Sequence, residues 1–453
     1  MGLTVYPTIL FNSSTGSDSA ASGAGPATAI TGTCAASTNS TTVTFNGTPD
    51  LTGVAQDGSH VLWVSGIGFV RISTVNTGAY TCVVETALTI GSGTDFAIGG
   101  KRATLDAAES RRLFAATSSP TASGMKAPCK VQIEDDQTIT SAITCSMNFT
   151  GVGEFIVEGV GQRTITQTGN AAFFACQQSS AKYRFRNFTP VHTNATKSHF
   201  VTTGATNTVI FENIICGNST GTNCPKGLTA RTGNASYVEA HNCSVLRCSG
   251  TAIENVEGAF LRGVEIARCA AGVLQSGTSA IDIHDTIIAQ NTGIGIQLTG
   301  TLGLGTHNEI CGNTIDGNGG DGIKVTGNNL SSPLRIVNNQ LTNNTGYGLN
   351  LSGTQPHTPI VQNNNFYANT TNPANGITLD ATNLTADPGY TDRTNTVRNY
   401  AVGTAMKAAG FPASTATIGA GQSGTTSYVD IGAAQRQEAS GGGYSRSGRG
   451  TIR

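Results

Sequence analysis

The sequence is poor in charged residues. Asp, Glu, Lys and Arg make up only 12% of its 453 residues, about half the share of an average globular protein. The formal net charge is −1, which offers no basic surface for nucleic acid or an anionic membrane. No apolar run reaches the roughly 20 residues that span a bilayer. The first residues, MGLTVYPTIL, lack a basic segment followed by an apolar core. We therefore expect no nucleic-acid partner, no membrane insertion, and synthesis and assembly in a cytoplasm.

Paired cysteine motifs are also missing. The eleven cysteines are an odd number, which excludes a complete internal disulfide framework, and none forms the CxxC pair typical of zinc sites. Buried thiols are expected, with no metal and no cofactor. The chain is instead rich in Asn, Thr and glycine (58 residues), with Ile, Val, Leu and Phe returning at regular places. This regularity indicates an ordered, β-rich chain.

A repeat organises the second half of the sequence. Each copy has an apolar anchor, Asn three residues later, Gly or a small residue seven later, and apolar residues eight and ten later, with local deviations in the weaker copies. The copies follow one another at intervals of 21 to 27 residues, a period typical of solenoids. The anchors are Val245, Ile266, Ile288, Ile315, Leu341 and Phe366. Apolar residues alternate in runs such as GIQL, GIKV and GLNL, which predicts short strands.

These features predict an all-β fold, a right-handed parallel β-helix in which equivalent residues of successive coils lie above one another. The position three residues after the anchor then forms a column. Its residues are Cys248, Cys269, Asn291, Asn318, Asn344 and Asn369. Amide side chains stacked about 4.8 Å apart can hydrogen-bond to each other and to the backbone of the turns. A structural ladder is therefore expected at this position.

The stretch ICGNTIDGNGGDGIKV contains Asp316 and Asp321, which could form a calcium loop, a sugar-cleaving pair or part of the turns. An EF-hand loop needs Glu at its twelfth position, where this chain has Gly327. A repeated calcium nonapeptide also fails, because the equivalent coils carry Ala289 and Thr342 in place of Asp316. We expect both aspartates to serve the turns, with a lone calcium ion as the minor alternative.

The chain is expected to have four parts. Residues 1–115 lack the repeat and contain short β-prone runs, which predicts a small β-domain or cap. Within it, Leu105–Ala116 is the best helix candidate. Residues 116–395 form the β-helix. Residues 396–437 are expected to form a C-terminal cap with a short helix and a strand, and residues 438–453 a flexible tail rich in Gly and Arg.

Three stretches resemble a known superfamily. They are GSDSAASGAGPATAI near the N-terminus, DFAIGGKRATL from Asp95 to Leu105, and TTSYVDIGAAQRQ near the C-terminus. They are similar to segments of pectin-lyase-like right-handed β-helix proteins found in tailed-phage and environmental sequences. The resemblance implies a tail fibre, tailspike or capsid-surface protein, or a polysaccharide enzyme. The fold itself does not name a function. The sequence lacks the Gly-His-Gly motif of polygalacturonases and the Arg-x-Pro-x-x-Arg stretch of pectate lyases.

One pair of carboxylates is a candidate for catalysis. Asp282, Glu309 and Arg335 each stand six residues before an anchor, so the repeat places them in one column. Asp282 and Glu309 could then lie about 5 to 9 Å apart, as in glycosidases. The alternative is a solvated charge ladder in which Arg335 neutralises Glu309. The residues expected nearby are His284, Asp285 and His307.

Two functions follow as expectations, and whether the chain is an enzyme stays open. The first is a structural virion protein of a tailed bacteriophage. It would be a rigid β-helix that forms a homotrimer, binds other virion proteins through a terminal region, and contacts host glycans. The second is a tailspike-type polysaccharide depolymerase, a glycoside hydrolase or lyase, that uses Asp282 and Glu309. A secreted pectinase-like enzyme is the least favoured alternative.

Overall fold

In the computed structural model the chain forms two compact units, residues 1–215 with 231–234, and residues 216–230 with 235–453. The structure describes residues 7–117, 124–125, 130–148, 154–176, 182–193, 199–202, 207–217, 227–228, 230–231, 236–255, 257–278, 280–302, 308–326, 330–393 and 400. Apart from Tyr400, the predicted C-terminal cap at 396–437 and the tail at 438–453 lie outside these residues. No helix in the described part of the chain is long and apolar enough to cross a membrane.

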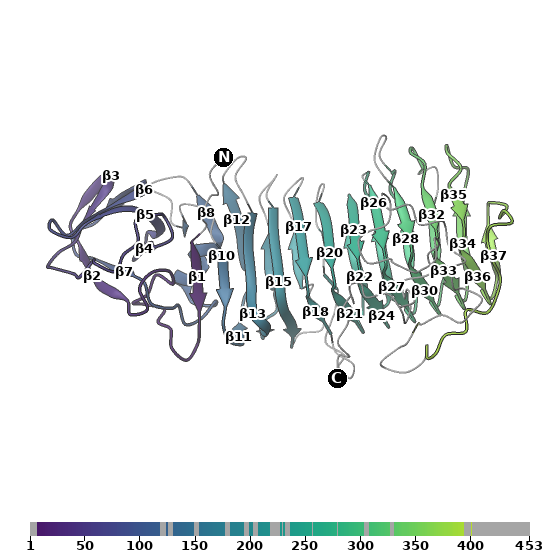
Figure 1. The fold of residues 1–453 in the computed structure, drawn as a ribbon, viewed down its shortest axis with the longest axis horizontal. Coiled ribbons are helices and arrows are strands. Elements are labelled where there is room, and N and C mark those ends of the chain that lie inside the picture. The colour runs from purple at the N-terminus through teal and green to yellow at the C-terminus, as the bar shows by residue number, and fades with distance from the viewer. Residues whose placement is uncertain are drawn as a thin grey trace, which may run out of the picture. The chain divides into compact units, whose positions relative to one another are not determined.

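An antiparallel sheet occupies part of the first unit (Figure 1). Its strands are β2 (Ile30–Cys34), β3 (Ser37–Thr44), β4 (Val61–Val64), β5 (Gly68–Asn76), β6 (Thr81–Ile90) and β7 (Thr94–Ile98), with β9 (Gly124–Met125) in parallel beside β5. They lie in the order β2, β7, β4, β5, β6, β3. Apolar side chains such as Leu62, Val70 and Phe96 fill one common core. This sheet falls within the region where the sequence predicted a small β-domain.

Parallel coils make up the rest of the first unit. Their strands are β1 (Thr8–Phe11), β8 (Ala115–Thr117), β10 (Lys130–Ile133), β11 (Gln137–Ile139), β12 (Ile143–Asn148), β13 (Glu154–Gln167), β14 (Phe174–Cys176), β15 (Lys182–His192), β16 (Phe200–Thr202) and β17 (Asn207–Glu212). One sheet runs in the order β1, β10, β13, β15, β17, with β11 also paired to β13, and another in the order β8, β12, β14, β16. Phe185 packs 4.8 Å from both Phe174 and Phe200, measured between ring centres. Closely packed, tilted aromatic rings therefore contribute much of this core.

The predicted helix at Leu105–Ala116 is shorter than expected. It consists of α1 (Ala108–Arg111) followed by the 3-10 turn η1 (Arg112–Phe114). Leu105, Leu113 and Phe114 are fully buried, whereas Ala108 at the start of the helix is exposed. The chain leaves the helix directly into β8, which limits its length.

A buried arginine joins segments of the first unit that are distant in sequence. Arg102 is fully buried and donates hydrogen bonds to the carbonyl oxygens of Asp18 and Ala21, each at 2.7 Å. Its guanidinium lies 5.7 Å from the ring centre of Trp63 and 5.6 Å from that of Phe69, close enough for cation–π attraction. Segments from residues 16–30 and 95–105 therefore pack together around one side chain.

We expect Arg102→Met to destabilise the first unit by roughly 2–5 kcal/mol, because it leaves buried carbonyl oxygens without their donors. Urea unfolding followed by the fluorescence of Trp63, the one tryptophan of the sequence, measures this effect. Arg112→Met is the matched control, since Arg112 makes an exposed hydrogen bond to the Gly66 carbonyl. Equal urea midpoints for the two variants would contradict the role of Arg102.

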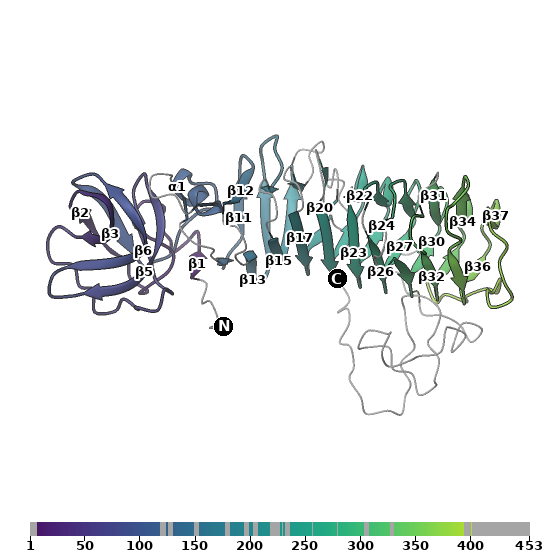
Figure 2. The ribbon, with the colours of Figure 1, turned by 90° about the horizontal axis from the view of Figure 1, so that it is seen from above.

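Each coil of the second unit supplies one strand to each of three parallel sheets (Figures 1 and 2). The first sheet contains β20 (Ser236–His241), β23 (Gly258–Arg262), β26 (Ile281–His284), β29 (Glu309–Cys311), β32 (Arg335–Val337) and β35 (Ile360–Gln362). The second contains β21 (Ser244–Leu246), β24 (Glu265–Ala267), β27 (Ile287–Ala289), β30 (Thr314–Asp316), β33 (Gln340–Thr342) and β36 (Asn365–Tyr367). The third contains β22 (Thr251–Asn255), β25 (Ala271–Gln275), β28 (Ile296–Leu298), β31 (Ile323–Thr326), β34 (Tyr347–Ser352) and β37 (Asn372–Asn375). The chain passes between the two units at β18 (Ile215–Cys216) and β19 (Ala230–Arg231).

The predicted anchors form one buried column in the second sheet. Each anchor is the Cα partner of the next, from Val245 through Ile266, Ile288, Ile315 and Leu341 to Phe366. All of them are at most 2% exposed. The stacking predicted from the repeat, and with it the parallel β-helix, is confirmed.

Left-handed bends flank every strand of the second sheet. The residues before the strands have φ between 50° and 66°; they are Asn242, Gly263, Asp285, Gly312, Asn338 and Asn363. The residues after the strands have φ between 52° and 63°; they are Arg247, Arg268, Gln290, Gly317, Asn343 and Ala368. Glycine and asparagine adopt this conformation at the lowest cost. The corners therefore explain part of the high Gly and Asn content.

The predicted ladder follows the second bend of each coil. The side-chain amide of Asn291 donates to the amide oxygen of Asn318 at 2.9 Å, Asn318 to Asn344 at 2.9 Å, and Asn344 to Asn369 at 3.0 Å. The same oxygens accept backbone N–H groups, for example that of Asn318 at Asn344 (3.1 Å). The amide of Asn318 also donates to the Ile288 carbonyl at 3.2 Å. Each asparagine thus satisfies backbone groups at a corner, where regular strand pairing is interrupted.

Cysteines occupy the ladder position in two earlier coils. The backbone N–H of Cys269 donates to the Asn291 side chain at 2.9 Å, and that of Cys248 to the Cys269 sulfur at 3.4 Å. Cys248 is disulfide-bonded, so the expectation of a free thiol is wrong at this position. The cysteines described as free are Cys34, Cys82, Cys145, Cys176, Cys216, Cys243, Cys269 and Cys311.

A second ladder follows the first bend, and the sequence analysis missed it. Asn313 donates to Asn339 at 2.9 Å, Asn339 to Asn364 at 2.9 Å, and Asn364 to Asn383 at 3.1 Å. The signal was an asparagine two residues before three successive anchors. Neighbouring asparagines hid it, because stretches such as QNNNF contain several candidates for one column.

We expect Asn318→Ala to destabilise the second unit by roughly 2–4 kcal/mol, because its neighbours in the ladder lose both a donor and an acceptor in a fully buried place. Chemical denaturation followed by far-ultraviolet circular dichroism measures the effect. Asn372→Ala, at an exposed position of β37, serves as control and should change the midpoint little. A comparable loss in both variants would show that the ladder adds nothing beyond the strands.

Candidate functional site

Asp282 and Glu309 lie on the outward face of the first sheet of the second unit. In β26 the side chain of Ile283 is fully buried, so the alternation of the strand turns Asp282 and His284 to the outside. Asp282 is the Cα partner of Glu309, and Glu309 is the partner of Arg335. This is the column that the repeat predicted.

Each carboxylate divides its two oxygens between an arginine and His284. Asp282 Oδ2 lies 3.1 Å from Arg262 Nη2, and Oδ1 contacts His284 Nε2. Glu309 Oε1 lies 3.6 Å from Arg335 Nε, and Oε2 lies 3.6 Å from His284 Nε2. The side chains of Asp282 and Glu309 are only 13% and 7% exposed. The pair therefore belongs to a partly shielded network of charges.

The same three side chains offer ligand atoms for a divalent cation. One oxygen each of Asp282 and Glu309 and one nitrogen of His284 lie within 4.8 Å of one another, and divalent metals accept such ligands. The two arginines already supply positive charge to these carboxylates. They would repel a cation bound between them, so the arrangement fits an ion-pair network better than a metal site.

The surroundings of Asp282 favour its ionised form. Burial raises its pKa, but hydrogen bonds and charge from His284 and Arg262 outweigh burial and hold the pKa below the ordinary 3.8. Asp282 is therefore suited to act as a nucleophile or charge stabiliser and unsuited to donate a proton at neutral pH. Burial, with the nearby charge of Glu309, raises the pKa of Cys311 to about 12. This thiol stays protonated and is a poor nucleophile.

The other residues expected near the pair have different roles. Asp285 forms a left-handed bend with φ of 50°, and His307 lies outside the described residues. Sequence reasoning missed Arg262 and an aromatic pair. Phe260 is the Cα partner of Asp282 on the preceding coil, and its ring centre lies 6.3 Å from that of Tyr237. The signal for Arg262 was its equivalence to His284 in the repeat.

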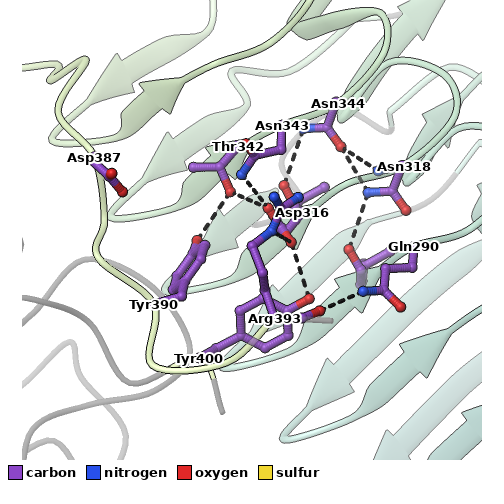
Figure 3. Close-up of polar contacts among 12 residues, drawn as sticks. Gln290, Asp316, Asn318, Thr342, Asn343, Asn344, Asp387, Tyr390, Arg393 and Tyr400 are labelled. Atoms are coloured by element: carbon purple, nitrogen blue, oxygen red, sulfur yellow. Dashed lines mark hydrogen bonds and ion pairs between the residues drawn. The ribbon is translucent and has the colours of Figure 1, made fainter. Parts of the chain in front are cut away.

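Asp316 is not a turn residue, which corrects the expectation from the sequence (Figure 3). It is the last residue of β30 and is fully buried. Its Oδ1 accepts hydrogen bonds from Thr342 Oγ1 and Asn343 Nδ2, both at 2.8 Å. Its Oδ2 accepts from Arg393 Nε at 3.1 Å and from the Tyr400 hydroxyl at 3.2 Å. These partners are all donors, so the carboxylate is used as an acceptor for protein groups.

Asp321 also differs from expectation. It is 8% exposed and accepts hydrogen bonds from the backbone N–H of Tyr347 and from Asn350 Nδ2, both at 2.8 Å. Asp321 therefore ties its coil to the next one. Gly317 does adopt a left-handed turn conformation, with φ of 63°. At Gly319 the requirement is close stacking, because a Cβ would lie 2.2 Å from the Thr292 carbonyl oxygen.

Residues 223–366 match the family model described as right handed beta helix region. They include the whole anchor column, while the last asparagines of the two ladders, Asn369 and Asn383, lie beyond them. The chain is a right-handed parallel β-helix protein. No match was found among curated proteins or solved structures. The function of this β-helix protein is therefore argued from its own side chains.

We expect Asp282→Asn to make the free energy of unfolding of the second unit depend less strongly on pH in the acid range. The pKa of Asp282 is lower in the folded than in the unfolded state, so the ionised group stabilises the fold above pH 3.8. That contribution is lost as the pH falls below 3.8. Urea midpoints of the second unit, measured from neutral pH to about pH 3, should fall more steeply for the wild type than for the variant.

Glu239→Gln is the control for this titration. Glu239 stands in the same column two coils earlier, with His241 two residues after it, but its side chain is 34% exposed. Its variant removes a carboxylate from the same column and keeps the ion pairs of Asp282 with Arg262 and His284. If the urea midpoints of Asp282→Asn and the wild type fell equally with pH, the lowered pKa of Asp282 would be refuted.

Proposed function

We propose that this protein is a structural component of tailed-bacteriophage particles, in which the β-helix forms a rigid fibre, spike or capsid-surface element. The observation that supports a structural role is the matched charge on the outward sheet faces. In the second unit, Asp282 and Glu309 each lie beside an arginine. In the first unit, Arg184 lies 2.9 Å from Glu154 and also pairs with Glu212. Ion pairs between side chains of adjacent coils stabilise the stacking of strands.

The phage assignment rests on the resemblance of three stretches, and the packing of two of them around Arg102 supports their common structural use. In this proposal the chain is made in the host cytoplasm and becomes part of the virion. It associates as a homotrimer and binds other virion proteins through a terminal region. Host glycans are the proposed ligands of the outward face, where the Phe260 and Tyr237 rings and the Asp282 carboxylate offer stacking and hydrogen bonding to sugars.

Particles purified from infected cells are expected to contain this chain in fixed proportion to the major capsid protein. Quantitative mass spectrometry gives the proportion, and electron microscopy with a labelled antibody gives the position on the particle. Analytical ultracentrifugation of the isolated protein should give the mass of a trimer. Particles from a phage with the gene disrupted control for antibody specificity. Absence of the chain from intact particles would rule out the structural role.

One observation favours a second candidate function, the depolymerase. Carboxylate oxygens of Asp282 and Glu309 lie within 4.8 Å of each other, and retaining glycosidases hold their two carboxyl groups about 5 Å apart. Asp282, which is ionised, would act as the nucleophile, and Glu309 would protonate the leaving oxygen. The arginines beside both groups argue against this candidate, because they already engage one oxygen of each.

Incubation of the protein with the host surface polysaccharide separates the two candidates. A depolymerase releases new reducing ends, and Asp282→Asn or Glu309→Gln should each reduce the rate at least 100-fold, as expected when a nucleophile or general acid is removed. Glu239→Gln should leave the rate unchanged. A wild-type protein that binds the polysaccharide without releasing reducing ends would eliminate the depolymerase.

A further inference from the structure

A segment beyond the last coil lies against the second sheet (Figure 3). The hydroxyls of Tyr390 and Thr342 are 3.1 Å apart. Arg393 reaches Asp316 through its side chain, and its carbonyl oxygen accepts a hydrogen bond from Gln290 Nε2. These contacts run from β33 past β30 to β27. We call residues 390–393 together with Tyr400 the strap.

The strap explains why Asp316 is buried. Ile315 belongs to the inward anchor column, so Asp316, the next residue of the strand, points to the outside of the coil. Its Cα partners in adjacent coils are Ala289 and Thr342, which carry no charge. An outward carboxylate that is nevertheless 0% exposed must be covered by another segment. Burial of a lone charge is costly, and Arg393 offsets that cost.

The two oxygens of Asp316 serve different parts of the protein. Oδ1 accepts hydrogen bonds only from the coil above, through Thr342 and Asn343, among its described partners. Oδ2 accepts from the strap, through Arg393 and Tyr400. The carboxylate therefore joins the strap to the solenoid while it also joins two coils. A substitution that removes only the acceptor at Oδ2 can therefore break the contact with the strap and keep the contact between coils.

The strap binds the coils through polar contacts, and the ring of Tyr400 is also buried, at 2% exposed. The rings of Tyr390 and Tyr400 pack against each other at 4.9 Å and 90°, and the hydroxyl, guanidinium and carbonyl groups of the strap contact the coils. Burial and the charge of Asp316 raise the pKa of Tyr390 well above its ordinary value, which keeps its hydroxyl protonated and able to donate. Water can replace such partners when they separate, whereas it cannot replace the apolar contacts of the anchors.

We propose that the strap is a latch, held on the flank of the β-helix by Asp316, that can leave this flank while the coils beneath it stay folded. Release exposes Gln290, Asp316 and Thr342 as a new polar surface. This inference does not depend on the proposed function, since it concerns contacts within the chain.

Trypsin cleavage after Arg393 in the full-length protein measures release. The protease must bind the Arg393 side chain, which is engaged with Asp316 when the strap is docked. Asp316→Asn keeps an oxygen for Thr342 and Asn343 but turns an NH2 group toward the donors of the strap. We expect cleavage at this bond to become roughly 10- to 100-fold faster, since hydrogen bonds to charged groups are replaced by a repulsive contact. Mass spectrometry of the fragments identifies the bond.

Asp321→Asn is the matched control. Asp321 is a buried carboxylate of the same coil whose described partners, Tyr347 and Asn350, belong to the next coil. Its variant should weaken the coils without selective cleavage after Arg393. Arg393→Gln, examined by hydrogen exchange because the cleavage site is removed, should raise exchange in residues 390–393 and leave β27, β30 and β33 protected.

Three results would overturn the latch. The first is unchanged cleavage after Arg393 in Asp316→Asn. The second is equal acceleration in Asp321→Asn, which would mean that cleavage follows general loosening of the coils. The third is loss of exchange protection throughout β27, β30 and β33 in Arg393→Gln, which would make the strap an integral part of the fold. Hydrogen exchange of Arg393→Gln also tests the latch if Asp316→Asn does not fold, because it leaves Asp316 unchanged.

Discussion

Each coil must turn corners without leaving backbone hydrogen-bonding groups unpaired, and the rest of the structure depends on how this is achieved. A left-handed residue makes the turn, and the next residue places an amide inside the corner. The amide oxygen accepts a backbone N–H of the preceding coil, and the amide nitrogen donates to a backbone carbonyl, as Asn318 and Asn339 do. A buried unpaired group would cost about 1–3 kcal/mol, a cost that the asparagines avoid at the corners they occupy.

Once the corners stack, the remaining side chains divide into two classes. Inward residues such as Ile288 and Ile315 form apolar columns at the strand spacing, and small residues such as Gly319 allow the backbones of adjacent coils to approach. Most outward residues meet neighbours on their own and adjacent coils, and Asp316 also meets the strap. Charged groups there can pair across coils, and Asp282 with Arg262 is one such pair. The inward columns hold the fold together, while the outward columns are free to differ.

The sequence alone predicted the features that are set by the spacing of the repeat. The anchors, the first ladder and the register of Asp282 with Glu309 all follow from counting residues, because in a solenoid equal spacing means vertical stacking. The second ladder obeyed the same rule but was obscured where asparagines are adjacent, as at Asn363 and Asn364. The side-chain partners of Asp282 could not be derived, since Arg262 and His284 reach it through rotamers that the period does not determine.

Asp316 was misinterpreted for a different physical reason. Its local pattern, with Gly317 beside it, is that of a turn, and its decisive partners Arg393 and Tyr400 lie 77 and 84 residues away, outside the repeat. A solenoid is stabilised by contacts between neighbouring coils, so its coils can unfold one after another. A strap that contacts several coils at once makes them depend on a common segment. The buried carboxylate therefore adds long-range coupling to an otherwise one-dimensional structure, and a polar contact lets that coupling be reversible.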